Sequence, residues 1–141
     1  MKYRKKRKTM NMKQFLVKMA MALGIAGIVG CNTPADARKS ALVLEPTEYI
    51  KALQADNAAF LLDVRRADEY AEGHLPGAAL LDVTDSIGFA EGMKSLDKEK
   101  TIYIYCRSGR RSQTAAKRLI DNGFRVIDMQ GGYNAWKKLE K

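Results

Sequence analysis

Apolar residues along this chain form two kinds of run, which alternate from residue 41 onward. Short continuous runs rich in branched and aromatic residues are typical of strands buried on both faces of a sheet. Between them, apolar residues recur at helical spacing, as at Tyr49, Ile50 and Leu53 after the helix-opening Pro46. The predicted strands are 41–44, 60–64, 78–81, 101–105 and 126–129, and the predicted helices are 47–54, 67–72, 112–122 and 133–139.

Strands that alternate with helices at this spacing favour a parallel sheet covered on both faces. Residues 82–100 are the ambiguous stretch. Asp85 or Ser86 can begin a helix there, but Gly88 and Gly92 weaken it, so we expect a broken helix and a loop. The whole pattern predicts one α/β domain over residues 41–141, with a five-stranded, mainly parallel sheet.

The first 30 residues have a different pattern, in which a cationic stretch precedes an apolar core over residues 19–30. About twelve apolar residues are too few to span a membrane as a stable helix, but they suit the central region of a secretory signal. The segment ends in Ile28-Val29-Gly30-Cys31, which resembles the lipobox of bacterial lipoproteins. That resemblance implies cleavage before Cys31 and lipidation of its sulfur. Ordinary secretion, with cleavage near residues 35–37, is the alternative.

We therefore expect three parts: a lipoprotein signal peptide over residues 1–30, a lipidated tether over 31–40, and the domain over 41–141. Several acyl chains on Cys31 would anchor the protein stably, since one chain alone gives only marginal membrane binding. The expected location is extracytoplasmic, at the periplasmic face or the cell surface of a bacterial membrane.

The positive charge of the chain belongs mostly to this leader. The sequence has 25 Lys and Arg against 16 Asp and Glu, a formal net charge of +9. Eight of the basic residues and none of the acidic ones lie in residues 1–30. The rest of the chain is nearly neutral, so its charge does not support nucleic acid as a partner of the domain.

The strongest chemical signal is Cys106, which ends an apolar strand and is followed by Arg107-Ser108-Gly109-Arg110-Arg111 and a helical pattern. A thiol in that position faces loop amides, the positive end of a helix and fixed cations, all of which favour the nucleophilic thiolate. The alternative is a cysteine that only fills space in the core. Arginine and glycine are poor core material, so we predict that Cys106 is a nucleophile.

The two cysteines also raise the possibility of a disulfide, because exported proteins commonly form them. A Cys31–Cys106 bridge is therefore one alternative. If Cys31 carries lipid, Cys106 is a lone thiol in an oxidising compartment, where an unprotected thiol is at risk of oxidation. Its retention there is best explained by a function.

Three segments of the predicted domain carry the motifs of one known family, in the order in which that family has them. The first is 61–65 (Leu-Leu-Asp-Val-Arg), followed by Glu69-Tyr70 and by 73–78 (Gly-His-Leu-Pro-Gly-Ala). The second is 105–112 (Tyr-Cys-Arg-Ser-Gly-Arg-Arg-Ser), and the third is 131–136 (Gly-Gly-Tyr-Asn-Ala-Trp).

With these motifs the chain resembles the rhodanese family. The resemblance implies a three-layer rhodanese-like fold and a single-domain sulfurtransferase that needs no cofactor. Cys106 would take a sulfane sulfur from a small donor anion such as thiosulfate, hold it as a persulfide, and pass it to cyanide or a thiol. Such covalent catalysis divides one transfer into two displacements.

The resemblance also implies roles for individual residues. Backbone N–H groups from Arg107 to Arg111 would converge on the sulfur, and Arg107, Arg110 and Arg111 would attract the donor, with Ser108 and Gly109 completing the anion site. Asp63 and Arg65 would form a buried supporting pair.

The remaining motif residues point to structure rather than chemistry. His74 is the only histidine and has no second soft ligand near it in the sequence, so we expect a hydrogen-bonding role and no metal site. Trp136 is expected to pack the last helix onto the sheet. Gly131 and Gly132 are expected to serve backbone geometry.

Two other functions stay open. Cysteine phosphatases and related arsenate reductases have an arginine six positions after the cysteine, where this chain has Ser112. The shorter loop makes a tighter pocket, which suits a sulfur atom better than a phosphoryl group. The alternative from another class is a persulfide carrier or sensor with little turnover, whose acceptor would be a protein.

Overall fold

The structure, a computed structural model, describes residues 40–141. The predicted signal peptide and Cys31 lie outside the described residues, as does the predicted tether up to residue 39. Among the helices that the structure describes, none is both long and apolar enough to cross a membrane.

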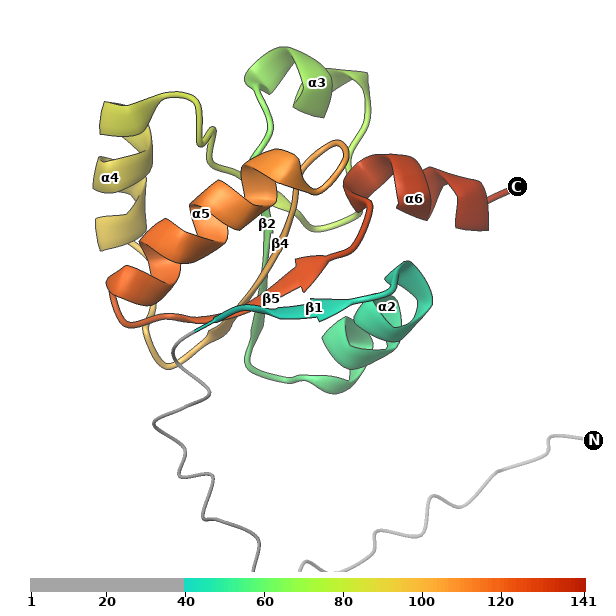
Figure 1. The fold of residues 1–141 in the computed structure, drawn as a ribbon, viewed down its shortest axis with the longest axis horizontal. Coiled ribbons are helices and arrows are strands. Elements are labelled where there is room, and N and C mark those ends of the chain that lie inside the picture. Colours follow the sequence, from blue (N-terminus) through green and yellow to red (C-terminus); the bar gives the residue numbers. More distant parts are fainter. Residues whose placement is uncertain (1–39) are drawn as a thin grey trace, which may run out of the picture. The chain divides into compact units, whose positions relative to one another are not determined.

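Strands and helices alternate along the described chain (Figure 1). The strands are β1 (Leu42–Leu44), β2 (Ala59–Asp63), β3 (Ala79–Leu80), β4 (Thr101–Tyr105) and β5 (Arg125–Met129). The helices are α2 (Pro46–Ala55), α3 (Ala67–Glu72), α4 (Ser86–Lys94), α5 (Arg110–Asp121) and α6 (Gly132–Leu139). All the predicted strands are therefore present.

The five strands form one sheet in the order β1-β5-β4-β2-β3, and every neighbouring pair is parallel. The predicted parallel sheet is thus confirmed. β4 is the central strand, with β2 and β5 on either side. Because the carboxyl ends of parallel strands meet at one edge of the sheet, Asp63, Cys106 and Asp128 come together from three neighbouring strands.

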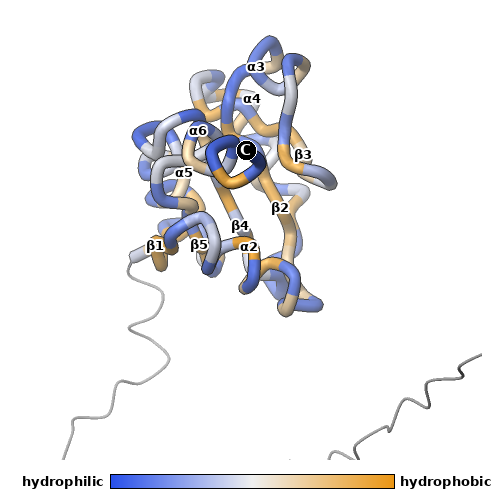
Figure 2. Tube along the Cα trace, turned by 90° about the vertical axis from the view of Figure 1, so that its right-hand side faces the viewer, coloured by the Kyte–Doolittle hydropathy of each residue, from blue (hydrophilic) through white to orange (hydrophobic). Residues whose placement is uncertain are grey.

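Helices cover both faces of the sheet, which gives the three layers that were predicted (Figure 1). On one face, α4 and α5 bury a cluster that includes Phe89, Ile104 and Leu119. On the other face, α2 and α6 pack over a cluster centred on Tyr49 and Met129. Figure 2 shows the hydrophobic colouring running along β2 and β4 between these layers.

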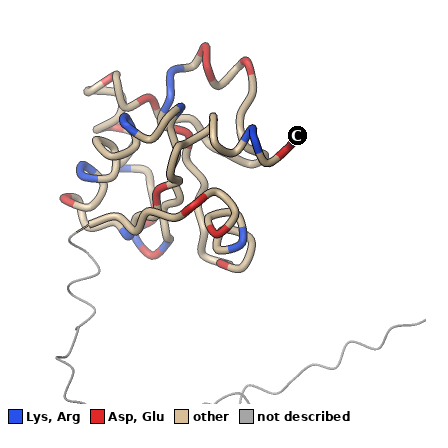
Figure 3. Tube along the Cα trace, turned by 45° about the vertical axis from the view of Figure 1, so that its right-hand side comes forward, with Lys and Arg blue, Asp and Glu red and all other residues tan. Residues whose placement is uncertain are grey.

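Charge is balanced within the domain: residues 40–141 contain 15 Lys and Arg and 15 Asp and Glu. In the view of Figure 3, positions of both signs are spread over the fold. The net positive charge of the chain therefore lies in the residues before 40.

The prediction of a broken helix over residues 82–100 was wrong, because α4 runs without a break. The Asp85 side chain caps the helix by accepting a hydrogen bond from the N–H of Gly88 at 2.9 Å. Phe89 is fully buried and Met93 is 8% exposed. Burial of two such side chains contributes roughly 2 kcal/mol each, more than the cost of about 1 kcal/mol per glycine.

Helix α5 begins at Arg110, two residues before its predicted start. Gly109 precedes it in the left-handed conformation, with φ +99°, and serves as its N-cap. Two of the loop arginines therefore belong to the first helical turn. The segment 106–109, here called the cysteine loop, is correspondingly short.

Candidate active site

Cys106 follows β4 directly, so the central strand of the sheet positions it. The residue is 1% exposed, and within residues 40–141 its thiol forms no disulfide. The N–H of Gly109 donates a hydrogen bond to Sγ at 3.0 Å, from three residues further along the loop. A sulfur that carries negative charge during a reaction accepts such a bond more strongly than a neutral sulfur does.

Backbone hydrogen bonds from the first turn of helix α6 fix the cysteine loop. The N–H groups of Tyr133 and Asn134 donate to the carbonyl oxygens of Cys106 and Arg107, at 2.7 and 3.0 Å. Because C=O and N–H point in opposite directions across a trans peptide, the N–H groups of Arg107 and Ser108 point away from α6. Within residues 40–141 these two amides have no acceptor. They are therefore available to an anion, as in other anion-binding loops.

Glycine is required where α6 approaches this loop. Gly131 and Gly132 have φ angles of +71° and +58°, in the region that favours glycine. A Cβ atom on Gly132 would lie 3.0 Å from the carbonyl oxygen of Arg107 and 2.9 Å from its carbonyl carbon. The expected backbone role of the glycine pair is thus confirmed.

The three arginines of the motif have different surroundings. Arg111 forms a two-bond ion pair with Glu69 of α3, with Nη1–Oε2 at 2.6 Å and Nη2–Oε1 at 2.7 Å. These bonds lower the pKa of Glu69 to about 2. Arg107 and Arg110 are exposed, and in the part of the chain that the structure describes their guanidinium groups have no ion-pair partner. These two are free to meet an incoming anion.

The expected convergence of amides on the sulfur is present at one position. Of the five N–H groups from Arg107 to Arg111, that of Gly109 lies within hydrogen-bonding distance of Sγ in the described structure. The amides at the start of α5 have no acceptor inside their own helix, as is general for a first turn. The first turn of α5 follows the cysteine loop directly, with its N-cap at Gly109, three residues after Cys106.

Asp63 and Arg65 form the expected buried pair. Nε of Arg65 lies 3.0 Å from both carboxylate oxygens of Asp63, and Nη2 lies 2.7 Å from Oδ2. The same Nη2 donates to the carbonyl of Gly73 at 2.7 Å, and Cζ lies 4.1 Å from the centre of the Tyr133 ring. The pair therefore joins the end of β2 to α6, which holds the cysteine loop.

His74 and Trp136 lie outside the contacts of the sulfur. The His74 ring stacks on Tyr70 at 3.7 Å, and its Nδ1 is 2.9 Å from the Tyr70 carbonyl oxygen. Trp136 is half-buried among the apolar residues under α6, as predicted. Over residues 40–141, no group of three His, Cys, Asp or Glu side chains is placed to hold a metal ion.

Asp128 and Ser112 lie behind the cysteine loop and were not recognised from the sequence. Oγ of Ser112 is 3.0 Å from the carbonyl oxygen of Gly109 and 3.1 Å from Oδ2 of Asp128. Asp128 is 2% exposed, and its burial raises the pKa of its carboxyl to about 6. The sequence signal that points to Asp128 is the alternation of side chains along β5, which places Asp128 on the same face as the core residue Val126.

The comparisons with known proteins agree with this geometry. A family model described as the rhodanese-like domain matches residues 45–139. The putative sulfurtransferase YtwF of Bacillus subtilis is 39% identical over 85 residues, which cover 60% of this chain and 80% of that protein. The thiosulfate sulfurtransferase GlpE of Pseudomonas fluorescens is 31% identical over 93 residues, which cover 65% of this chain and 82% of that protein.

A solved structure gives the same result at the level of the fold. The crystal structure of a rhodanese-like domain protein from Staphylococcus aureus matches with a TM-score of 0.60 and 29% identity, covering 67% of this chain and 90% of that one. The family model alone spans more than half of the sequence. The chain therefore belongs to the rhodanese-like domain family.

Proposed function

We propose that this protein is a sulfurtransferase that moves a sulfane sulfur from thiosulfate or a similar donor to a thiophilic acceptor through a persulfide on Cys106. One observation carries the proposal: Sγ accepts the N–H of Gly109 in a loop whose next amides, those of Arg107 and Ser108, have no acceptor among the described residues. The relatives named as sulfurtransferases support the same activity.

The transfer takes two displacements. The Cys106 thiolate attacks the outer sulfur of thiosulfate, a bond forms between the two sulfurs, and sulfite leaves with the electron pair of the broken bond. The acceptor, such as cyanide, then attacks the outer sulfur of the persulfide, and the thiolate returns with its electron pair as thiocyanate departs. The Gly109 amide stabilises the anion at the start and at the end of this cycle.

The charged residues at the loop suit a dianionic donor. Arg107 and Arg110 are exposed and unengaged in the described structure, so their planar guanidinium groups can bind an oxyanion with several oxygens. Arg111 contributes differently, because its ion pair with Glu69 secures the first turn of α5 to α3.

Phosphatase activity is less well supported by this site. The sixth position after the cysteine holds Ser112, which is fully buried and directed toward Asp128 rather than toward Sγ. It brings no positive charge to a phosphoryl group. The 1% exposure of Cys106 also restricts attack to small donors or to a terminal sulfur.

The test is the formation of thiocyanate from thiosulfate and cyanide by the full chain. Cys106→Ala should abolish it, and Cys106 of the unaltered protein should gain one sulfur by intact mass after thiosulfate alone. Arg107→Ala combined with Arg110→Ala should raise KM for thiosulfate, whereas the exposed Arg66→Ala should not. Turnover that persists in Cys106→Ala refutes the proposal. A retained sulfur with negligible turnover indicates a carrier instead.

We also propose that the domain is held outside the cytoplasm by lipid on Cys31. The support is the sequence around that residue, where an apolar core ends in Ile28-Val29-Gly30-Cys31. The mass of the protein isolated from bacterial cells should show removal of residues 1–30 and addition of acyl chains. Cys31→Ser should remove the lipid. An unmodified Cys31 in the isolated protein would contradict the assignment.

A further inference from the structure

A chain of three polar contacts leads from the sulfur of Cys106 into the interior. The N–H of Gly109 binds Sγ at 3.0 Å, and the carbonyl oxygen of the same glycine lies 3.0 Å from Oγ of Ser112. Oγ lies in turn 3.1 Å from Oδ2 of Asp128. Gly109 is thus held on one side by the sulfur and on the other by a buried hydroxyl.

The hydroxyl of Ser112 has one hydrogen, so it can donate to only one of its two neighbours at a time. If the carboxyl of Asp128 is protonated, it can donate to Oγ, and the hydroxyl is then free to donate to the Gly109 carbonyl. If the carboxylate is ionised, it attracts the hydroxyl hydrogen more strongly than a carbonyl does. The Gly109 carbonyl then loses its donor.

We propose that Asp128 is a positioning residue for Cys106: its protonated form directs the Ser112 hydroxyl onto the Gly109 carbonyl and so holds the Gly109 amide on the sulfur. Gly109 has φ +99°, so its orientation depends on the contacts that hold it. The inference deepens the proposed function, because it concerns the thiol that would carry the persulfide.

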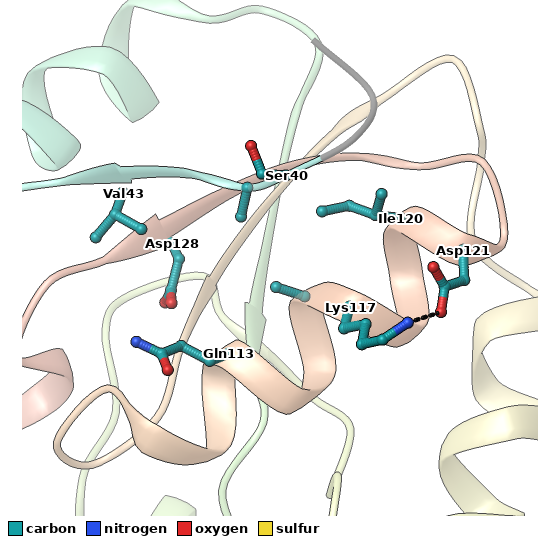
Figure 4. A pocket seen from close by; sticks show the side chains of 9 residues that line it. Ser40, Val43, Gln113, Lys117, Ile120, Asp121 and Asp128 are labelled. Carbon is teal, nitrogen blue, oxygen red and sulfur yellow. Dashed lines mark hydrogen bonds and ion pairs between the residues drawn. The ribbon is translucent and has the colours of Figure 1, made fainter. Parts of the chain in front are cut away.

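The surroundings of Asp128 allow its proton to exchange. Figure 4 shows its carboxyl in the wall of a cavity between β1 and α5, with Val43 and Gln113 beside it. A second cavity, on the side of the cysteine loop, is lined by Asp128 together with Ser108 and Gly109. Oδ1 has no hydrogen-bond partner within residues 40–141. Burial raises the pKa of this carboxyl to about 6, while the bond from Ser112 opposes the rise.

The titratable groups on the elements that pack against Asp128 are paired, exposed or neutral, so Asp128 is the group that gains or loses the proton in this argument. On α5, Lys117 and Asp121 neutralise each other at 2.6 Å, and Arg110 is exposed. On α2, across the sheet, burial raises the pKa of Tyr49 well above its usual value, and Asp128 adds to that rise. Tyr49 therefore stays neutral.

The two neighbouring strands add no charge either. β1 has no titratable residue. The tyrosines of β4, Tyr103 and Tyr105, belong to the cluster on the opposite face of the sheet.

The test is the rate at which iodoacetamide alkylates Cys106 in the full chain, followed by mass spectrometry of the peptide that contains it. Sγ attacks the methylene carbon and iodide leaves, so no sulfur donor is involved. Asp128→Asn keeps the shape of the side chain and supplies a permanent donor to Ser112. The ratio of its rate to that of the unaltered protein removes the pH dependence that the two proteins share and leaves the effect of residue 128.

We expect this ratio to be near one well below pH 6 and to rise about 3- to 10-fold above it, the range that one hydrogen bond supplies. In a Ser112→Ala background the ratio should stay constant with pH, since the relay is absent. Asp121→Asn, an exposed carboxylate change on α5, should give a ratio of one throughout.

A ratio for Asp128→Asn that does not change with pH overturns the proposal, because a merely structural effect would be the same at every pH. So does a pH-dependent ratio that survives in Ser112→Ala. Neither result depends on thiocyanate formation, so failure of the proposed activity and failure of this inference are separate outcomes.

Discussion

Two buried aspartates lie on the strands that flank β4, which carries Cys106, and their bonding partners differ. Asp63 at the end of β2 is fully buried and bound by Arg65 through three side-chain contacts of 2.7–3.0 Å. Asp128 on β5 is 2% exposed, and its one side-chain hydrogen-bond partner in the described structure is the hydroxyl of Ser112, with no cation in contact. The same residue type thus has a cation bound to it on one side of the central strand, and on the other side it has a hydroxyl group and a raised pKa.

The difference arises from the residues that come after each aspartate in the chain. Arg65 is two residues after Asp63 and reaches back to it, so a cation is supplied locally. Asp128 is followed by Met129 and Gln130, and burial without a cation disfavours its ionised form. A buried carboxylate is therefore structural or titratable according to whether a cation accompanies it.

The largest effect is expected from removing the cation of the Asp63–Arg65 pair. Arg65→Ala leaves the Asp63 carboxylate buried without its cation, with only the backbone N–H of residue 65 still donating to it, which should lower the free energy of unfolding by about 3–5 kcal/mol in urea denaturation at neutral pH. Arg66→Ala is the matched control: its ion pair with Asp68 is exposed to solvent, so its loss should change the free energy of unfolding far less. Equal losses from the two changes would show that Asp63 is not held as a charge.

The second largest effect is expected from changing Asp128. The folded-state pKa of Asp128 is about 6 against an ordinary 3.8, so the folded state keeps a proton that the unfolded chain releases. The contribution of this group to stability is present below about pH 4 and is lost as pH rises to about 6. Asp128→Asn should therefore stabilise the protein by on the order of 2–3 kcal/mol at pH 7 and by little at pH 4.

This difference is measured by urea denaturation at both pH values, with Asp121→Asn as the control carboxylate. A destabilised Asp128→Asn at pH 7 would indicate that the carboxylate is ionised and favourably bound, contrary to the comparison. The pH 4 measurement separates this from simple misfolding of the variant.

The smallest expected effect comes from a third carboxylate, Glu69, which resembles Asp63 in having a cation. Its pKa is lowered from 4.5 to about 2 by the bonds from Arg111, so its contribution is present above about pH 4.5 and is lost as pH falls toward 2. The pair is partly exposed, and we expect Glu69→Gln to cost about 1 kcal/mol at pH 7.

The loss should disappear in acid, which thermal or urea unfolding near pH 2 can measure. Asp68→Asn is the matched control, because Asp68 lies next to Glu69 and its ion pair is exposed. If Glu69→Gln loses the same stability at both pH values, packing rather than charge accounts for the contact.

Local patterning was sufficient to predict most of the fold. Every strand and every helix that the structure describes, apart from α4, was expected from the sequence pattern, since burial on both faces of a sheet imposes continuous apolar runs. Helix α4 was expected to be broken. Its glycines suggested a break, but burial of Phe89 and Met93 depends on contacts with distant elements that no local pattern reports.

The sequence by itself determined the order of elements, the parallel sheet, and the position of Cys106 in a short loop between β4 and α5. These depend on neighbours along the chain. Only the tertiary structure decided that Arg111 is occupied by Glu69, 42 residues away, and that Asp128 lies behind the loop through Ser112. Whether a charge is free, paired or protonated depends on which distant segments exclude water from it, and sequence spacing does not report that distance.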